Sequence, residues 1–151
     1  MSDSAEVVAR AFVNAINRQD VEGLTGLMMP EHRFVDSLEN VVEGREKMRA
    51  GWVGYFRMVP DYSIVVEEIY KAGPSTALRS AQDDKLNLRS AQVVVMLGKA
   101  RGTYSSDGEL KAENRWETPA AWRAVVEGGL VAEWRVYADN EPMRKLMRQA
   151  G

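Results

Sequence analysis

The spacing of the apolar residues changes at Pro60, and this change constrains the fold more than any other feature of the chain. Before Pro60 they recur every three to four positions, which is the period of an amphipathic α-helix. After Pro60 the period becomes two, as in β-strands. The expected helices cover 5–18, a short segment after Asp20 with Val21, Leu24, Leu27 and Met28 on one side, and 44–59. A brief strand is expected over 33–37. Longer strands are expected over 62–70, 93–104, 114–126 and 130–138.

The last three expected strands are joined by short turn-forming clusters, 105–108 (Ser-Ser-Asp-Gly) and 127–129 (Glu-Gly-Gly). Short turns of this composition connect antiparallel neighbours, so we expect an antiparallel meander. A closing helix is expected from Asn140, since Pro142 suits a first helical turn. The order of elements predicts an α+β fold, and a length of 151 residues predicts one domain over 1–151 with a single core.

The segment 74–92 does not fit this scheme, because a connection between antiparallel strands normally has about two to five residues. It contains the word Leu-Arg-Ser-Ala-Gln twice, at 78–82 and at 88–92. We interpret the segment as an insertion or local duplication at the tip of a hairpin that once ran from Tyr70 almost directly into Val93. A helical lid over a pocket and an extended β-arm used in assembly are the alternatives.

The composition excludes several classes of function. The chain has no cysteine and one histidine, His32, so thiolate catalysis, cysteine–zinc sites and sites with several histidines are ruled out. A net charge of −2 disfavours a nucleic-acid or anionic-membrane surface. The longest aliphatic run, Val93–Leu97, is too short to cross a bilayer, and the N-terminus does not read as a secretory signal. We therefore expect a cytoplasmic protein without a cofactor.

Four phrases of the sequence carry a resemblance to a known superfamily. They are Asn14–Leu24 (NAINRQDVEGL), the strand and turn of Asp36–Gly44, Val59–Tyr62 (VPDY) and Glu133–Asn140 (EWRVYADN). The chain resembles the SnoaL-like members of the nuclear transport factor 2-like superfamily, apart from 74–92. The resemblance implies the cone-shaped α+β fold shared with ketosteroid isomerase and limonene epoxide hydrolase, with helices closing over a curved antiparallel sheet. It also implies a mostly apolar cavity for a small organic molecule and a homodimer formed through the opposite sheet face.

The resemblance carries over only part of the enzymes' chemistry. Asp36 matches the catalytic base of ketosteroid isomerase, but the tyrosine of the oxyanion hole is replaced by Phe12 and the aspartate by Ala120 or Ala121. Steroid isomerisation is therefore disfavoured. The catalytic aspartate of limonene epoxide hydrolase is replaced by Val136, which disfavours epoxide hydrolysis. The broad SnoaL-like class, which includes polyketide cyclases, remains.

Asp36 is the candidate catalytic base, because an apolar environment makes a carboxylate a better proton acceptor near neutral pH and its neighbours Phe34 and Val35 are apolar. The alternative is a structural role as the cap of a turn. His32 is a second catalytic candidate, since His32, Phe34 and Asp36 point to the same side of a strand and His32 could share a proton with Asp36. A lone loop histidine is the alternative.

The tryptophans suggest a cavity wall. Trp116 and Trp122 share one face of the strand 114–126 with smaller residues between them, and Arg123 lies on the opposite face. If the indole face lines the cavity, the ligand is expected to be apolar and planar; if the charged face does, it is expected to be polar or anionic. Plain core packing is the alternative. The ligand-binding candidates are Phe12, Trp52, Tyr55, Phe56, Trp116, Ala120, Trp122 and Trp134.

Three hypotheses for function follow. The first is a cofactor-independent isomerase, cyclase or lyase that uses Asp36 as a base on a small, largely apolar molecule. The second is a protein with the same pocket that binds a small molecule without chemistry. The third is a dimeric assembly module in which the sheet forms the interface and the cavity is vestigial. The sequence contains no metal-ligand cluster, glycine-rich phosphate loop or basic stripe that would support a metalloenzyme, nucleotide-binding or nucleic-acid-binding reading.

Overall fold

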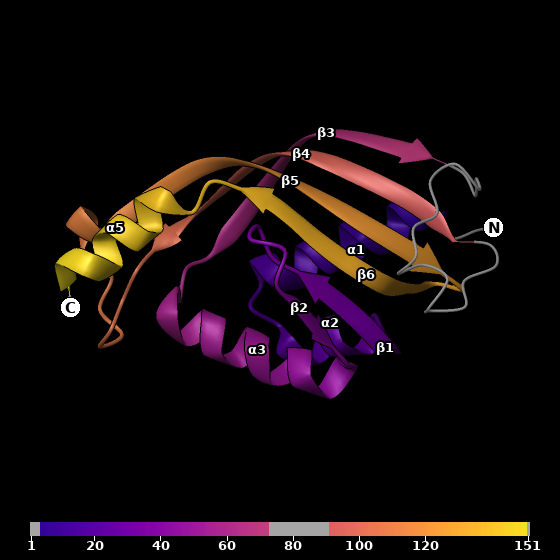
Figure 1. Ribbon diagram of the computed structural model, residues 1–151, viewed down its shortest axis with the longest axis horizontal. Coiled ribbons are helices and arrows are strands. Elements are labelled where there is room, and N and C mark those ends of the chain that lie inside the picture. The colour runs from indigo at the N-terminus through magenta and orange to yellow at the C-terminus, as the bar shows by residue number, and fades with distance from the viewer. Residues whose placement is uncertain (1–3, 73–90, 151) are drawn as a thin grey trace.

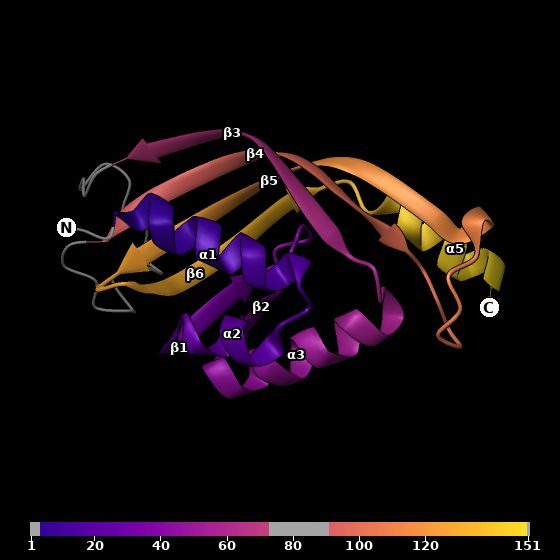
Figure 2. The same ribbon diagram turned by 180° about the vertical axis from the view of Figure 1, so that it is seen from behind.

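A computed structural model describes residues 4–72 and 91–150, and it shows a curved six-stranded sheet with helices packed against one face (Figures 1 and 2). The elements are α1 (Ala5–Asn17), α2 (Val21–Gly26), β1 (Met28–Val35), β2 (Val41–Glu43), α3 (Arg45–Met58), β3 (Ser63–Ala72), β4 (Gln92–Thr103), the 3₁₀ turn η2 (Ala112–Asn114), β5 (Arg115–Glu127), β6 (Leu130–Ala138) and α5 (Glu141–Ala150). Figure 1 views the sheet from its outer face, and Figure 2 views it from the side on which α1 lies in front. The predicted α+β class with a curved sheet is confirmed.

The strand order is β2-β1-β6-β5-β4-β3. The pairs β3–β4, β4–β5 and β5–β6 are antiparallel, which confirms the predicted meander. β1 extends the sheet by pairing with β6 in parallel, and β2 continues it as an antiparallel edge strand. The first strand of the chain thus lies beside the last one.

The beginning of the sheet differs from the prediction. The strand expected over 33–37 starts at Met28 and ends at Val35, so Asp36 and Ser37 lie in the turn that follows it. Met28 was expected on the short second helix, but it faces Val131 of β6. Pairing with a strand that is distant in sequence overrides the local helical pattern here. β2 was not predicted, because its three residues are too few to show a period.

The predicted insertion at 74–92 lies almost entirely outside the described residues, so it remains a prediction. The strands on either side of it are neighbours, since Ala72 faces Val93 in the β3–β4 ladder. Within the described part of the chain, no helix has the length and apolar character needed to cross a bilayer.

Side-chain bonds to the backbone attach the first helix to the third strand. Asn17, at the end of α1, donates to the carbonyl oxygen of Ile64 (3.0 Å) and accepts from its amide (2.8 Å). Gln19 donates from Nε2 to the carbonyl oxygen of Tyr62 (2.7 Å). The sequence between Val59 and Ile64 is therefore fixed from the helical side of the sheet.

The β4 strand fixes the same connection from the other side. The Asp61 carboxylate accepts bonds from the amide (2.7 Å) and the hydroxyl (2.8 Å) of Thr103. Gly102 allows this close approach, since a Cβ there would lie 2.3 Å from Cγ1 of Val59. Tyr62 thereby becomes a rigidly placed residue on the inner side of the sheet.

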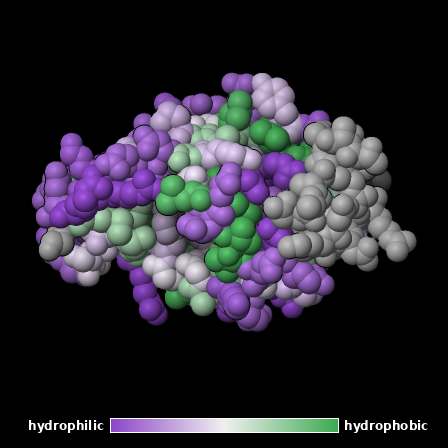
Figure 3. Space-filling model, in the orientation of Figure 1, coloured by the Kyte–Doolittle hydropathy of each residue, from purple (hydrophilic) through white to green (hydrophobic). Residues whose placement is uncertain are grey.

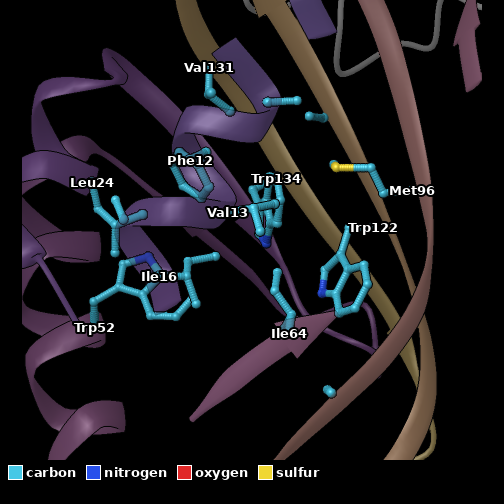
Figure 4. Packing of buried hydrophobic residues seen from close by; sticks show 14 of the residues in the cluster. Phe12, Val13, Ile16, Leu24, Trp52, Ile64, Met96, Trp122, Val131 and Trp134 are labelled. Carbon is cyan, nitrogen blue, oxygen red and sulfur yellow. The ribbon is translucent and has the colours of Figure 1, made fainter. Parts of the chain in front are cut away.

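The core fills the space between the helices and the inner face of the sheet, as Figure 4 shows. Phe12 of α1 packs on the Trp134 ring of β6 with a centroid distance of 4.5 Å. Phe12 and Leu24 are fully buried, and Trp134 and Trp122 are almost so. Removing such apolar area from water is the main source of stability in a fold of this kind. Several members of this core, among them Met48, Trp52 and Trp116, also line a cavity that remains on the inner face.

Candidate functional site

A cavity of about 330 Å³ lies between α3, the end of β1 and the inner face of the sheet. This volume is at the small end of the range for sites that bind organic ligands. Its described lining residues are Phe34, Asp36, Ser37, Val42, Met48, Gly51, Trp52, Tyr55, Tyr62, Ala100, Trp116, Trp134, Val136, Ala138 and Asn140. Most of them are apolar or aromatic, and Asp36 is the only one with a formal charge.

Five of the lining rings form a continuous chain of aromatic contacts. Phe34 meets Trp52 edge-on (6.2 Å between centroids), and Trp52 meets Tyr55 edge-on (6.3 Å). Tyr55 meets Tyr62 edge-on at 4.9 Å, and the Tyr62 ring is tilted on Trp116 at 6.2 Å. These separations and angles are those that aromatic rings prefer. These contacts join β1, α3, the residue directly before β3, and β5 into one aromatic wall.

Asp36 is placed by the turn between β1 and β2. Its Oδ1 accepts from the amides of Leu38 and Asn40 (2.9 Å each), and its Oδ2 accepts from the side-chain amide of Asn40 (3.1 Å). The half-buried carboxylate therefore caps its own turn while it lines the cavity. A carboxylate has about four acceptor positions, so the three bonds orient it and leave one position for another partner.

The last helix lies at the same end of the molecule. Asn140, just before α5, donates to the Ser37 hydroxyl (2.9 Å), and both residues line the cavity. The Tyr55 hydroxyl approaches the sulfur of Met143 at 3.9 Å. These contacts connect α5 to the turn that carries Asp36 and to the aromatic wall.

The two tyrosines of the wall are neutral donors. Burial raises the pKa of Tyr62 far above its usual value, although a hydrogen bond with Trp122 opposes the shift. Burial also raises the pKa of Tyr55, and the nearby Tyr62 adds to this effect. Both phenols stay protonated at physiological pH, so they can donate a hydrogen bond to an oxygen atom but cannot act as bases.

Two indole nitrogens of the wall are also donors. Nε1 of Trp52 and Nε1 of Trp116 are buried without a hydrogen-bond partner in the described structure. A buried N–H group without a partner costs free energy, and such groups are rare in proteins. Nothing in the described structure compensates these two.

The structure places the sequence-predicted residues in two groups. Asp36, Trp52, Tyr55, Trp116 and Trp134 line the cavity. The other four ligand-binding candidates are not among the described lining residues: Phe12, Phe56, Ala120 and Trp122. The indole face of β5 is the inner one, and the charged face that includes Arg123 is the outer one. Of the two orientations considered for this strand, the structure thus has the indole face inside, and Trp116 of that face lines the cavity.

His32 faces the same side of the sheet as Asp36 but lies in the core. It is fully buried, its ring is stacked 6.1 Å from Phe12, and its Nδ1 is bonded to the carbonyl oxygen of Val131 (2.9 Å). Burial lowers its pKa to about 4, and the bond to Val131 opposes the shift only in part. Positions four residues apart in a strand are separated by about 13 Å. The expected proton-sharing contact with Asp36 is not among the described interactions.

Sequence reasoning missed several lining residues, and Tyr62 and Asn140 are the most important of them. Tyr62 was predicted as the first residue of a strand, on the same face as Ile64, and was given no further role; it lies directly before β3. Its position in the VPDY phrase, directly after Pro60 and Asp61, is the one sequence signal that could have marked it. Asn140 gave a helix-start signal only, and its contact with Ser37 depends on the tertiary fold.

The outer face of the sheet carries a buried network of charges. Glu133 of β6 is almost fully buried and lies 3.0 Å from Nη1 of Arg123, 3.6 Å from Nε of Arg33 and 3.7 Å from Nε of Arg135. Arg33 also bonds Glu43 at 2.9 Å. Figure 3 shows the surface on this side, where apolar and polar side chains are interspersed over the sheet. Residues 4–72 and 91–150 hold no group of three or more acidic or histidine side chains that could bind a metal ion.

A family model described as a SnoaL-like domain matches residues 9–134. The chain belongs to the SnoaL-like family. The helices that cover the inner face and the strands that bear the aromatic wall all fall largely within this match. The comparison with curated proteins finds none that matches.

Solved structures with the same fold extend the likeness beyond the SnoaL-like match. A protein from Shewanella putrefaciens described as a candidate SnoaL-like polyketide cyclase is 15% identical, with a TM-score of 0.70 and 99% of each chain covered. A candidate polyketide cyclase from Streptomyces antibioticus is 18% identical, with a TM-score of 0.70 over 97% of this chain and 99% of that one. A protein from Catenulispora acidiphila with a ketosteroid isomerase-like fold, in complex with trimethylamine, is 14% identical, with a TM-score of 0.64 over 89% and 86%. At these identities the likeness establishes the fold.

Proposed function

We propose that this SnoaL-like protein binds a small, largely apolar organic molecule in the inner cavity and that Asp36 accepts a proton from it. The reaction class would be isomerisation, cyclisation or elimination without a cofactor. The observation that carries this proposal is the position of Asp36, which is the one charged residue among the described lining of an otherwise apolar and aromatic cavity. A carboxylate in such a place can act as a general base, and a base contributes typically about 10²- to 10⁴-fold to the rate.

Proton abstraction next to a carbonyl group also requires donors for the oxygen that becomes negative. Phe12, which replaces the tyrosine of the related isomerases, supplies none. We assign this role to the Tyr55 hydroxyl, since its only described hydrogen bond goes to a sulfur atom at 3.9 Å and sulfur is a weak acceptor. The raised pKa of Tyr55 supports the assignment, because the group remains a donor.

A test that needs no knowledge of the natural substrate uses 5-nitrobenzisoxazole, a flat aromatic compound. A general base removes its C–H proton while the ring N–O bond breaks, and the product 2-cyano-4-nitrophenolate is followed by its absorbance. We expect Asp36→Asn to lower kcat/KM for this elimination by about 100-fold or more. Asp107→Asn is the matched control, because Asp107 also caps a turn with Oδ1 but is exposed and away from the cavity.

The second candidate is a binding protein without chemistry. The observation in its favour is that the Asp36 carboxylate already accepts three hydrogen bonds from its own turn. In that case the wild-type protein, Asp36→Asn and Asp107→Asn would bind 5-nitrobenzisoxazole with similar affinity, and none of them would convert it faster than a free carboxylate buffer. This result would overturn the role of Asp36 as a base and leave the binding site.

We also propose a homodimer formed through the outer face of the sheet. The exposed side chains of Tyr137 (50% exposed) and Leu97 (36% exposed) on β6 and β4 support it, since large apolar groups on a sheet face are often covered by a partner. Light scattering coupled to size exclusion should give twice the chain mass, and Tyr137→Glu should give the monomer. A monomeric wild-type protein at micromolar concentration would contradict the dimer.

A further inference from the structure

We infer that the ligand of the inner cavity is an organic cation, a protonated amine or a quaternary ammonium group on a small apolar body. This inference names the ligand class of the site on which the proposed function rests. It depends on two features of the described lining: the sign of its charge and the nature of its walls.

The first feature is charge. Among the described lining residues Asp36 bears a negative charge, and no lysine or arginine is present. The arginines Arg33, Arg123 and Arg135 lie on the outer face of the sheet, where Glu133 pairs with them. The partners of the Asp36 carboxylate are neutral amides of its own turn. The cavity therefore has a net negative charge that a cationic ligand would neutralise and an anionic ligand would oppose.

The second feature is the aromatic wall. A cation is attracted to the face of an aromatic ring, and tryptophan and tyrosine attract it best. The rings of Tyr55 and Tyr62 are perpendicular to each other at 4.9 Å, so they present faces in two directions within one site. Trp52 and Trp116 extend the wall on either side. Aromatic rings in several orientations around one site recognise quaternary ammonium groups, and Asp36 lines the same cavity as these rings.

The two indole N–H groups without a partner indicate that the ligand also carries a hydrogen-bond acceptor. Nε1 of Trp52 and Nε1 of Trp116 are donors, so they suit an acceptor atom such as a hydroxyl or carbonyl oxygen. A ligand that carries both a cationic nitrogen and a neutral oxygen would satisfy the carboxylate, the rings and these donors together. An anionic ligand would satisfy the donors alone.

The test compares three probes of similar shape: choline, its neutral analogue 3,3-dimethylbutan-1-ol, and the anion 3,3-dimethylbutanoate. Their affinities for the wild-type protein are measured by ligand-observed NMR with competition. We expect choline to bind at least about tenfold more tightly than the alcohol, and the anion to bind most weakly. Equal affinities, or a preference for the alcohol or the anion, would overturn the inference and leave the cavity as a binding site for another class of ligand.

A variant separates the charge from the rings. Asp36→Asn should lower the affinity for choline by about tenfold and leave the affinity for the alcohol unchanged, while Asp107→Asn should change neither. A choline affinity that Asp36→Asn does not alter would overturn the assignment of Asp36 as the partner of the cation. If none of the three probes binds at millimolar concentration, the inference fails. If 5-nitrobenzisoxazole also fails to bind, the proposed function fails with it.

Discussion

The carboxylates of Glu133 and Asp36, which lie on opposite sides of the sheet, have different kinds of partners. On the outer face, Glu133 is almost fully buried and is surrounded by three guanidinium groups. On the inner face, Asp36 is half-buried beside an aromatic wall and is bonded to neutral amides. The charge of Glu133 is neutralised by arginines of the protein itself. The hydrogen-bond partners of Asp36 carry no positive charge. The difference shows that the partners of a carboxylate, and not its burial alone, decide whether its charge is neutralised within the protein.

The largest expected effect is on the outer face. Glu133→Gln removes the negative charge and leaves three buried or half-buried arginines without it, so the free energy of unfolding should fall by about 3–5 kcal/mol. Urea denaturation followed by circular dichroism measures this. Glu117→Gln is the control, because Glu117 pairs with Arg101 at 3.8 Å on an exposed surface and should change stability by less than about 1 kcal/mol. Equal losses in both variants would show that burial of the network does not matter.

The next effect concerns the inner face, where a titratable group is buried in its neutral form. The folded pKa of His32 is about 4 and its usual value is 6.5, so the unfolded chain binds a proton that the folded chain does not between these values. Stability should therefore fall as the pH decreases from about 6.5 to 4, by about 3 kcal/mol on account of His32. The measurement is the free energy of unfolding against pH for the wild type and for His32→Asn, whose amide can still donate to Val131.

The difference between these two curves isolates the histidine from the carboxylates, which titrate in both proteins. We expect the curves to be parallel above pH 7 and to converge below it, with the wild type losing more stability on acidification. Curves that remain parallel down to pH 4 would show that His32 is protonated in the folded protein and that its surroundings are not apolar.

A smaller effect is expected where the helical layer joins the sheet. Asn17→Ala removes the bonds to both backbone groups of Ile64 and leaves them partly buried, which should cost about 1–3 kcal/mol. Asn14→Ala is a matched control on the exposed side of the same helix. If the Asn17 bonds position the aromatic wall, Asn17→Ala should also weaken the binding of choline. An unchanged affinity would show that these bonds do not position the cavity.

The smallest effect on stability is expected for Asp36→Asn. The asparagine keeps an oxygen for the amides of Leu38 and Asn40 and loses only the bond to the Asn40 side chain, so the loss should be about 1 kcal/mol or less. Thermal unfolding at pH 7 measures it. A large loss, comparable to that of Glu133→Gln, would make Asp36 a structural residue and would contradict its proposed role as a base.

Most of the sheet could be predicted because its signals are local. The alternation after Pro60 and the Gly-containing turns define β3 to β6, and the meander follows from turn length alone. The first half of β1 could not be predicted, since it forms by pairing with β6, about one hundred positions away. β2 could not be predicted because its three residues, which pair with the nearby β1, are too few to show a period. The helical spacing through Met28 indicated a longer helix that the sheet does not permit.

The candidate site could be predicted only in part, for a related reason. Asp36 and Trp116 were identified from resemblance and from strand parity, and both line the cavity. Strand parity also placed His32 on the same face, but parity does not show whether a residue on that face lies in the core or in the cavity wall. The sequence could not show that Tyr62 and Asn140 reach the cavity, because the first depends on the bond between Asp61 and Thr103 and the second on the contact with Ser37.

The most direct test of the contrast between the two faces is a crystal structure of the protein grown with choline. We expect the trimethylammonium group to lie in the inner cavity, within about 6 Å of the ring centroids of Tyr55 and Tyr62, on the side that faces Asp36. An inner cavity that holds only water at saturating choline, or choline bound at the Glu133 network instead, would contradict it.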